Sequence, residues 1–277
     1  MNDQKHSQQF TQSSESTNTP NPLHQLRKAD SVLSIVQADI PKPCIIVPSI
    51  LTAGEATLLA AGAGSGKTYI SQYIAACVAA GTTSFGNEPC EAKKVLYIDA
   101  ELGLHQIQTR FGNIFNAIGA GPGDQLFRVI HRKSIPGGMP DLATPDGFDA
   151  LASDIEWADV VIFDNLSALY TSAEELNQND WNYYNKCIDA LRNEGKAILI
   201  LHHTDKTGKN YRGHTEIARA VDNVLIAAKD LKLSTNAVTV VDIAQSKSRN
   251  GASSEKLMSI AFGDVYNDGQ FLMVRAK

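Results

Sequence analysis

The chain has few cysteines, and their spacing argues against two common kinds of site. Only four of its 277 residues are cysteine, and no two of them form a Cys-x-x-Cys pair. This spacing argues against a zinc site and against a disulfide framework. Cys77 and Cys187 fall on apolar faces of predicted helices, where we expect buried, reduced thiols.

Long apolar segments are absent as well. No run approaches the roughly 20 apolar residues of a membrane-spanning helix. The N-terminus has no apolar stretch of the kind found in secretory signals. The sequence therefore predicts a cytoplasmic protein with no membrane contact.

An excess of positive charge is also missing. The formal net charge is −5, whereas a protein that binds nucleic acid over its whole surface is usually basic. Any contact with nucleic acid would have to come from a local basic cluster. The length is sufficient for one large α/β domain with a substantial core.

The beginning of the chain differs in composition from the rest. Ser, Thr, Asn and Gln dominate the first 22 residues, which cannot bury enough apolar surface to offset the loss of chain entropy. We expect a disordered tail over residues 1–28 and a short helix and linker over 29–43, which ends in two prolines. One domain is expected over 44–277.

Within that domain, apolar strand-like runs alternate with helical patterns. Strands are expected at 56–60, 95–99, 126–131, 160–164, 197–201, 223–228, 238–244, 257–262 and 270–274. Helices are expected at 67–80, 104–118, 148–157, 180–193 and 215–221. This order predicts an α/β fold with a mostly parallel central sheet flanked by helices, and antiparallel strands at the C-terminal end.

A glycine-rich loop joins the first of these strands to the first helix. The run AGAGSGKT matches a Walker A motif, with Ala61 where the usual first glycine stands. Its backbone N–H groups and the helix start favour phosphate, Lys67 adds a full charge, and the Thr68 hydroxyl suits Mg²⁺. Residues expected to bind ATP here are Gly62, Ala63, Gly64, Ser65, Gly66, Lys67, Thr68 and Tyr69.

Two further strands end in carboxylates. Asp164 ends the apolar run VVIFD, as a Walker B aspartate that would hold Mg²⁺ with Thr68 does; a helix N-cap is the alternative. Glu101 lies just beyond the run VLYID, where we expect it to activate the attacking water. Alternation puts Asp99 on the same side, although Asp99 could simply anchor neighbouring loops.

A pair of histidines follows another strand. His202 and His203 end the run AILIL, where a polar side chain could sense the γ-phosphate and signal to the next loop. A structural role is the alternative for either ring. The pattern does not decide which of the two faces the nucleotide.

With these motifs placed, most of residues 48–263 resembles the RecA/DnaB superfamily of ring or filament ATPases, and within it the RepA-type plasmid and phage replicative helicases. The segments that carry the resemblance are YIDAEL and LHHTDKTGKNYRG. It implies a RecA-like P-loop NTPase fold, ATP and Mg²⁺ as ligands, and a homo-oligomer, most simply a hexameric ring. It further implies single-stranded DNA as a partner, and a replication initiator or primase as protein partners.

The resemblance also assigns roles to basic residues outside the loop. SKSRNG is similar to the Lys-x-Arg element of DnaB-type helicases, so Lys247 and Arg249 would reach the ATP of a neighbouring subunit; a solvated basic hairpin is the alternative. Arg110 matches an arginine that stacks on adenine, although an exposed helix arginine would look the same.

Two loops are expected to face the centre of a ring. The loop after Asp164, over 170–180, is acidic and unsuited to phosphate. The loop over 204–212 carries Lys206, Lys209 and Arg212, which resemble a single-strand-binding cluster. Arg212 could instead serve a neighbour's nucleotide site, for which Arg219 is a weaker candidate.

Two functions follow. The first is an ATP-dependent DNA helicase or translocase subunit of RepA type that acts in plasmid, phage or mobile-element replication and hydrolyses ATP at subunit interfaces. The second is a regulatory or loader ATPase that switches protein partners without unwinding DNA, because the RecA fold serves both uses.

Overall fold

The computed structural model describes residues 31–86, 88–89, 91–121, 123, 125–173, 181–249, 255–264 and 271–276. It divides into two compact units, Met1–Lys42 and Pro43–Lys277. In the first unit, helix α1 (Val32–Gln37) begins where the Ser31 side chain accepts a hydrogen bond from the Ser34 N–H. The tail expected over 1–28 lies outside the described residues.

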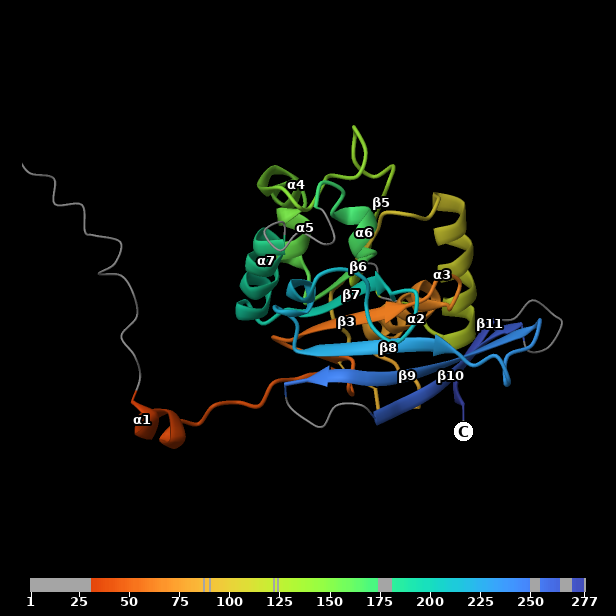
Figure 1. The fold of residues 1–277 in the computed structure, drawn as a ribbon, viewed down its shortest axis with the longest axis horizontal. Coiled ribbons are helices and arrows are strands. Elements are labelled where there is room, and N and C mark those ends of the chain that lie inside the picture. Colours follow the sequence, from red (N-terminus) through yellow and green to blue (C-terminus); the bar gives the residue numbers. More distant parts are fainter. Residues whose placement is uncertain are drawn as a thin grey trace, which may run out of the picture. The chain divides into compact units, whose positions relative to one another are not determined.

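The second unit is built on a sheet of nine strands (Figure 1). They are β3 (Ala56–Ala61), β4 (Val95–Asp99), β5 (Phe127–His131), β6 (Val160–Asp164), β7 (Ala197–His203), β8 (Asn223–Lys229), β9 (Val238–Ser248), β10 (Glu255–Asp264) and β11 (Phe271–Ala276). Their order is β11-β10-β9-β8-β3-β7-β6-β4-β5. Strands β8 to β5 of this order pair in parallel, and β9, β10 and β11 pair antiparallel. The predicted mixed sheet is confirmed.

Helices cover both faces of this sheet (Figure 1). One face packs against α2 (Lys67–Ala80) and α3 (Leu104–Ile118). The other packs against α5 (Ala152–Trp157), α6 (Leu166–Leu169) and α7 (Trp181–Asn193). A separate small sheet of β1 (Ile45–Val47) and β2 (Leu51–Thr52) was not expected from the sequence.

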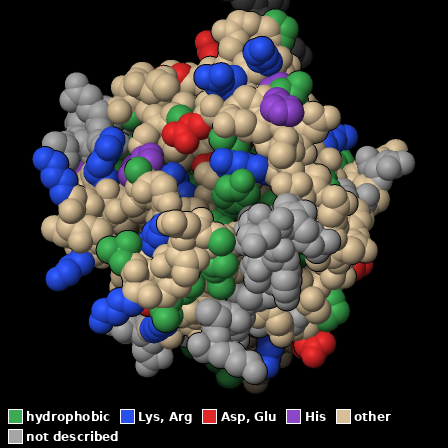
Figure 2. Space-filling view, turned by 90° about the vertical axis from the view of Figure 1, so that its right-hand side faces the viewer, with side chains coloured by type: hydrophobic (Ala, Val, Ile, Leu, Met, Phe, Trp, Pro, Cys, Tyr) green, Lys and Arg blue, Asp and Glu red, His purple; other side chains and the backbone are tan. Residues whose placement is uncertain are grey.

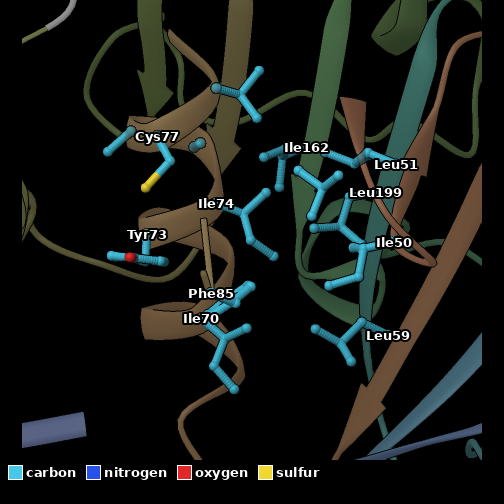
Figure 3. Close-up of a cluster of buried hydrophobic side chains, with 14 of the residues drawn as sticks. Ile50, Leu51, Leu59, Ile70, Tyr73, Ile74, Cys77, Phe85, Ile162 and Leu199 are labelled. Carbon is cyan, nitrogen blue, oxygen red and sulfur yellow. The ribbon is translucent and has the colours of Figure 1, made fainter. Parts of the chain in front are cut away.

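On the α2 face, the side chains of the core recur along each helix and strand with the residue spacing of that element. Ile70 and Ile74, four residues apart on α2, meet side chains that alternate along the strands, such as Ile162 and Leu199 (Figure 3). The α2 helix ends at Gly81, whose φ of 63° is the left-handed conformation expected of a glycine C-cap. This packing fixes the helix that follows the glycine-rich loop against the strands that carry the carboxylates.

Replacing Ile74 by alanine should destabilise the fold by about 2–5 kcal/mol, because its fully buried side chain would leave a cavity between α2 and the sheet. Denaturant unfolding followed by circular dichroism would measure the change. Leu104, 56% exposed at the start of α3, is a control whose alanine variant should stay within about 0.5 kcal/mol. Equal effects of the two variants would contradict this description of the core.

Two predicted helices differ from the structure. The helix expected over 148–157 is divided into α4 (Pro145–Asp149) and α5, since the Thr144 side chain caps an earlier start and a tight turn at Leu151 separates the two. The helix expected over 215–221 is only a 3-10 turn (Thr215–Ala218). It stops because the Asp222 N–H, which a helix would bond to Ala218, donates instead to the Ala56 carbonyl of β3.

Candidate nucleotide site

The glycine-rich loop forms an anion cradle at the start of α2. Gly64 and Gly66 have φ angles of 70° and 88°, which glycine adopts without strain. The first turn of α2 has no acidic residue and no side-chain cap, so its N–H groups remain able to bind an anion. Lys67 lies in this turn and is 7% exposed. The arrangement fits the phosphates of a nucleotide.

The predicted metal-binding residues lie beside the cradle. Asp164 is 1% exposed at the end of β6, and its Oδ1 accepts a hydrogen bond from Thr68 Oγ1 at 3.4 Å. Burial raises the pKa of Asp164 to about 6, while hydrogen bonding by Tyr97 and the charge of Lys67 act in the opposite direction. Carboxylate and hydroxyl oxygens suit Mg²⁺, which usually takes few protein ligands and completes its shell with phosphate and water.

Glu101 is exposed just beyond β4 and is held from two sides. Asn165 Nδ2 donates to Glu101 Oε1 at 2.6 Å, while Asn165 Oδ1 accepts the Ala168 N–H at 3.1 Å. Asp99 Oδ1 accepts the N–H groups of Glu101 and Leu102. Asp99 therefore anchors the loop that carries Glu101, and Asp99 and Asp164 sit opposite each other on adjacent strands.

The two histidines point to opposite faces of the sheet. Leu199 and Leu201 of β7 pack on the α2 face, so His203 follows them to the side of the nucleotide site by alternation. His202 is fully buried on the other face, and its Nε2 is hydrogen-bonded to the Arg212 carbonyl at 2.7 Å. The geometry thus separates a histidine on the face of the glycine-rich loop and α2 from one that holds the next loop on the other face.

Arg110 does not lie free on α3. Its guanidinium lies 4.2 Å from the centre of the Tyr69 ring, and Tyr69 stacks on Phe262 with the ring centres 5.9 Å apart. A Cβ on Gly66 would overlap the Phe262 ring, so this aromatic stack lies directly against the cradle. These three side chains form a stack beside the phosphate site, with the guanidinium of Arg110 over the Tyr69 ring and Phe262 buried against the cradle.

Lys247 and Arg249 lie near the opposite end of the sheet from the cradle. Lys247 Nζ donates to the carbonyls of Ala218 and Val221. Arg249 bonds the carboxylate of Asp222 at 3.3 Å, and Asp222 lies beside the start of β3. From there to the glycine-rich loop is about 20 Å, at roughly 3.3 Å per residue over β3. Neither side chain can serve the cradle of its own subunit.

The basic loop stays next to the cradle. The Thr204 N–H donates to the Ala61 carbonyl at 3.2 Å, and Thr204 bridges to Tyr211, which closes the loop at its base. A pocket between the two loops is lined by Gly62, Ala63, Gly64, Ser65, Thr204, Gly208, Ala227, Ala228 and Lys229. Lys206, Lys209 and Arg212 are exposed. Figure 2 shows the side of the molecule that lies at the right in Figure 1, where basic and hydrophobic side chains lie together.

Parts of the expected surface lie beyond what the structure describes. Residues 174–180 of the acidic loop are outside the described residues. In the described ranges there is no cluster of three or more His, Cys, Asp or Glu able to hold a metal ion without other ligands. Among the same ranges no helix is both long and apolar enough to cross a bilayer.

Three residues of the site carry no motif of their own. Asn165 immediately follows the predicted metal-binding aspartate, and Tyr97 precedes Asp99 by two residues on the same strand face, so proximity could have indicated both. Phe262 comes from β10, and no local signal in the sequence places it against the glycine-rich loop.

Comparison with known proteins agrees with the fold. The AAA_25 family model, described as an AAA domain, matches residues 20–209. A search of curated proteins finds no significant match. Among solved structures, the KaiC-like protein PH0186 from the hyperthermophilic archaeon Pyrococcus horikoshii OT3 superposes with a TM-score of 0.52 at 15% identity, over 82% of this chain and 91% of that chain. At this identity the likeness shows a shared fold, which is the RecA-like one.

Proposed function

Because this chain belongs to the AAA domain family that matches residues 20–209 and is a RecA-like P-loop ATPase, we propose that it is an ATP-dependent DNA translocase or helicase subunit of RepA type, acting in replication of a plasmid, phage or mobile element. The observation that carries the proposal is the direct attachment of the exposed basic loop to β3, the strand that leads into the glycine-rich loop, through Thr204 and Ala61. Hydrolysis at the cradle can then move a surface that suits a DNA backbone.

In this proposal each group at the cradle has one task. Lys67 and the first-turn N–H groups of α2 neutralise the phosphates. Thr68 and Asp164 hold Mg²⁺, which draws charge from the phosphate oxygens when bound. Glu101, oriented by Asn165, accepts the proton of the attacking water. Arg110, which lies over the Tyr69 ring, offers its planar guanidinium to the base.

Movement of the basic loop would start at the histidine pair. His203 lies on the face of the cradle, and the Arg212 N–H donates to its carbonyl at 2.9 Å. His202 holds the Arg212 carbonyl from the other side of the strand. A shift of this strand end on loss of the γ-phosphate would therefore displace both ends of the loop that carries Lys206 and Lys209.

The test of DNA coupling is ATP hydrolysis with and without single-stranded DNA. We expect strong stimulation in the native protein, lost in a Lys206→Ala, Lys209→Ala double variant that keeps its DNA-free rate. The slope of log affinity against log salt should fall by about 1 for each phosphate contact removed. Lys93→Ala, Lys94→Ala, which removes two lysines just before β4, is the control. Hydrolysis indifferent to DNA would favour a regulatory or loader ATPase instead.

The proposed oligomer, most simply a hexamer, completes each site with a second subunit. Arg249→Ala removes the arginine given to a neighbour, and Lys67→Ala removes the cradle charge. We expect both variants to be inactive alone and a mixture to regain part of the rate, because some interfaces then combine an intact cradle with an intact arginine. A mixture no faster than its parts, with subunit exchange shown by fluorescence energy transfer between differently labelled assemblies, would oppose the shared site.

A further inference from the structure

A buried tyrosine connects the elements on both sides of the cradle. Tyr97, in the middle of β4, is fully buried on the α2 face. Its hydroxyl donates to Asp164 Oδ2 at 2.6 Å, and Ser71 Oγ of α2 lies 2.7 Å from the same hydroxyl. A chain of polar contacts thus runs from α2 through β4 to the end of β6.

The direction of these hydrogen bonds follows from their chemistry. An ionised carboxylate only accepts, so the single phenolic hydrogen of Tyr97 is committed to Asp164. Bonds between a hydroxyl and a charged carboxylate are short and strong, as the 2.6 Å separation shows. The other carboxylate oxygen, Oδ1, faces Thr68 at 3.4 Å, which is a much weaker contact. Asp164 is therefore held firmly by one oxygen and loosely by the other.

We propose that Tyr97 is a positioning residue for Asp164, holding Oδ2 so that Oδ1 is presented to Mg²⁺ beside the Thr68 hydroxyl. The inference rests on the proposed nucleotide site but not on DNA coupling. A carboxylate that binds Mg²⁺ must keep one geometry, since this ion tolerates little departure from octahedral coordination. Outer partners of metal ligands commonly set that geometry.

Packing alone does not explain the hydroxyl. A phenylalanine would fill the same space between α2 and the sheet, where Tyr97 already meets Phe111 edge to face with the ring centres 5.9 Å apart. A buried hydroxyl costs free energy unless it is hydrogen-bonded. Its two partners come from the helix that starts at the cradle and from the predicted metal ligand.

The test is the Mg²⁺ dependence of nucleotide binding in Tyr97→Phe. Binding of a fluorescent ATP analogue would be titrated with Mg²⁺ and repeated in EDTA. We expect the Mg²⁺ concentration for half-maximal binding to rise about 10-fold, with binding in EDTA unchanged. Tyr73→Phe is the matched control, because Tyr73 is another buried phenol of the α2 face whose hydroxyl does not contact Asp164. Its Mg²⁺ dependence should equal that of the native protein.

A second variant keeps the test decisive if Tyr97→Phe does not fold. Ser71→Ala removes the other partner of the phenol and should raise the half-maximal Mg²⁺ concentration by a smaller factor. Native Mg²⁺ dependence in a folded Tyr97→Phe, or failing that in Ser71→Ala, would overturn the inference. A failure of the proposed function can be told apart from a failure of this inference. If DNA does not stimulate hydrolysis but Tyr97→Phe still shifts the Mg²⁺ dependence of nucleotide binding, the DNA-coupled function is wrong and the role of Tyr97 stands.

Discussion

Replacing Lys67 by alanine is expected to lower the rate of ATP hydrolysis by about 10²–10³-fold without unfolding the protein. The side chain is 7% exposed in the first turn of α2, next to N–H groups that no side chain of that turn caps. Because the side chain is buried, water screens its charge less than it would at the surface, so the charge should attract bound phosphates more strongly. Loss of the charge weakens the binding of the substrate in its ground state. It weakens the binding of the transition state more severely, because negative charge moves on the transferred phosphoryl group there.

The measurement is steady-state phosphate release, with the unfolding midpoint followed in parallel. Lys186→Ala on α7 is the matched control, since this exposed lysine belongs to the helix layer on the other face of the sheet. A Lys67→Ala protein that is folded and hydrolyses ATP at the native rate would show that the cradle takes no part in the reaction.

Replacing Glu101 by glutamine is expected to reduce kcat by about 10²–10⁴-fold, the usual contribution of a general base. Glutamine keeps the shape and can still contact Asn165, but its neutral oxygen is a far weaker proton acceptor. Binding of nucleotide should be almost unaffected, because Glu101 lies beyond the strand end and is not among the groups that hold phosphate or metal.

Single-turnover hydrolysis separates this effect from product release, and binding of a fluorescent ATP analogue checks the ground state. Glu91→Gln is the control: this exposed carboxylate precedes β4 and pairs with Lys93 at 2.8 Å. A normal single-turnover rate in Glu101→Gln would move the role of base to another carboxylate, of which Asp99 is the nearest on the same strand.

Much of the nucleotide site could be predicted from short segments of the sequence. The helix after the glycine-rich loop and the strands that end in Asp99 and Asp164 have the predicted bounds in the structure, and the strand before the loop is one residue longer than predicted, because it includes Ala61. Such features are readable because a strand repeats every two residues and a helix every 3.6, so hydrophobic spacing marks both the element and its end. Motifs at those ends then fall on one edge of a parallel sheet.

The tertiary structure decided which elements that are far apart in the chain come into contact. Because side chains alternate along a strand, His202 and His203 face opposite sides of the sheet. Only the packing of α2 showed that His203 lies on the same side as the cradle. Likewise, the bond from Tyr97 to Asp164 spans 67 residues. The period of a strand says which residues share a face, and never which helix will cover it or which strand will lie beside it.

The placement of the basic residues shows the same division. The resemblance of SKSRNG to the Lys-x-Arg element singled out Lys247 and Arg249 as candidates, yet their attachment to the segment around Asp222, near the far end of the sheet, depends on β9 running antiparallel to β8. Strand order is set by the total free energy of packing the whole sheet, to which any one segment contributes little. The sequence by itself therefore determined the chemistry available at the site, and the fold decided which of those groups could meet.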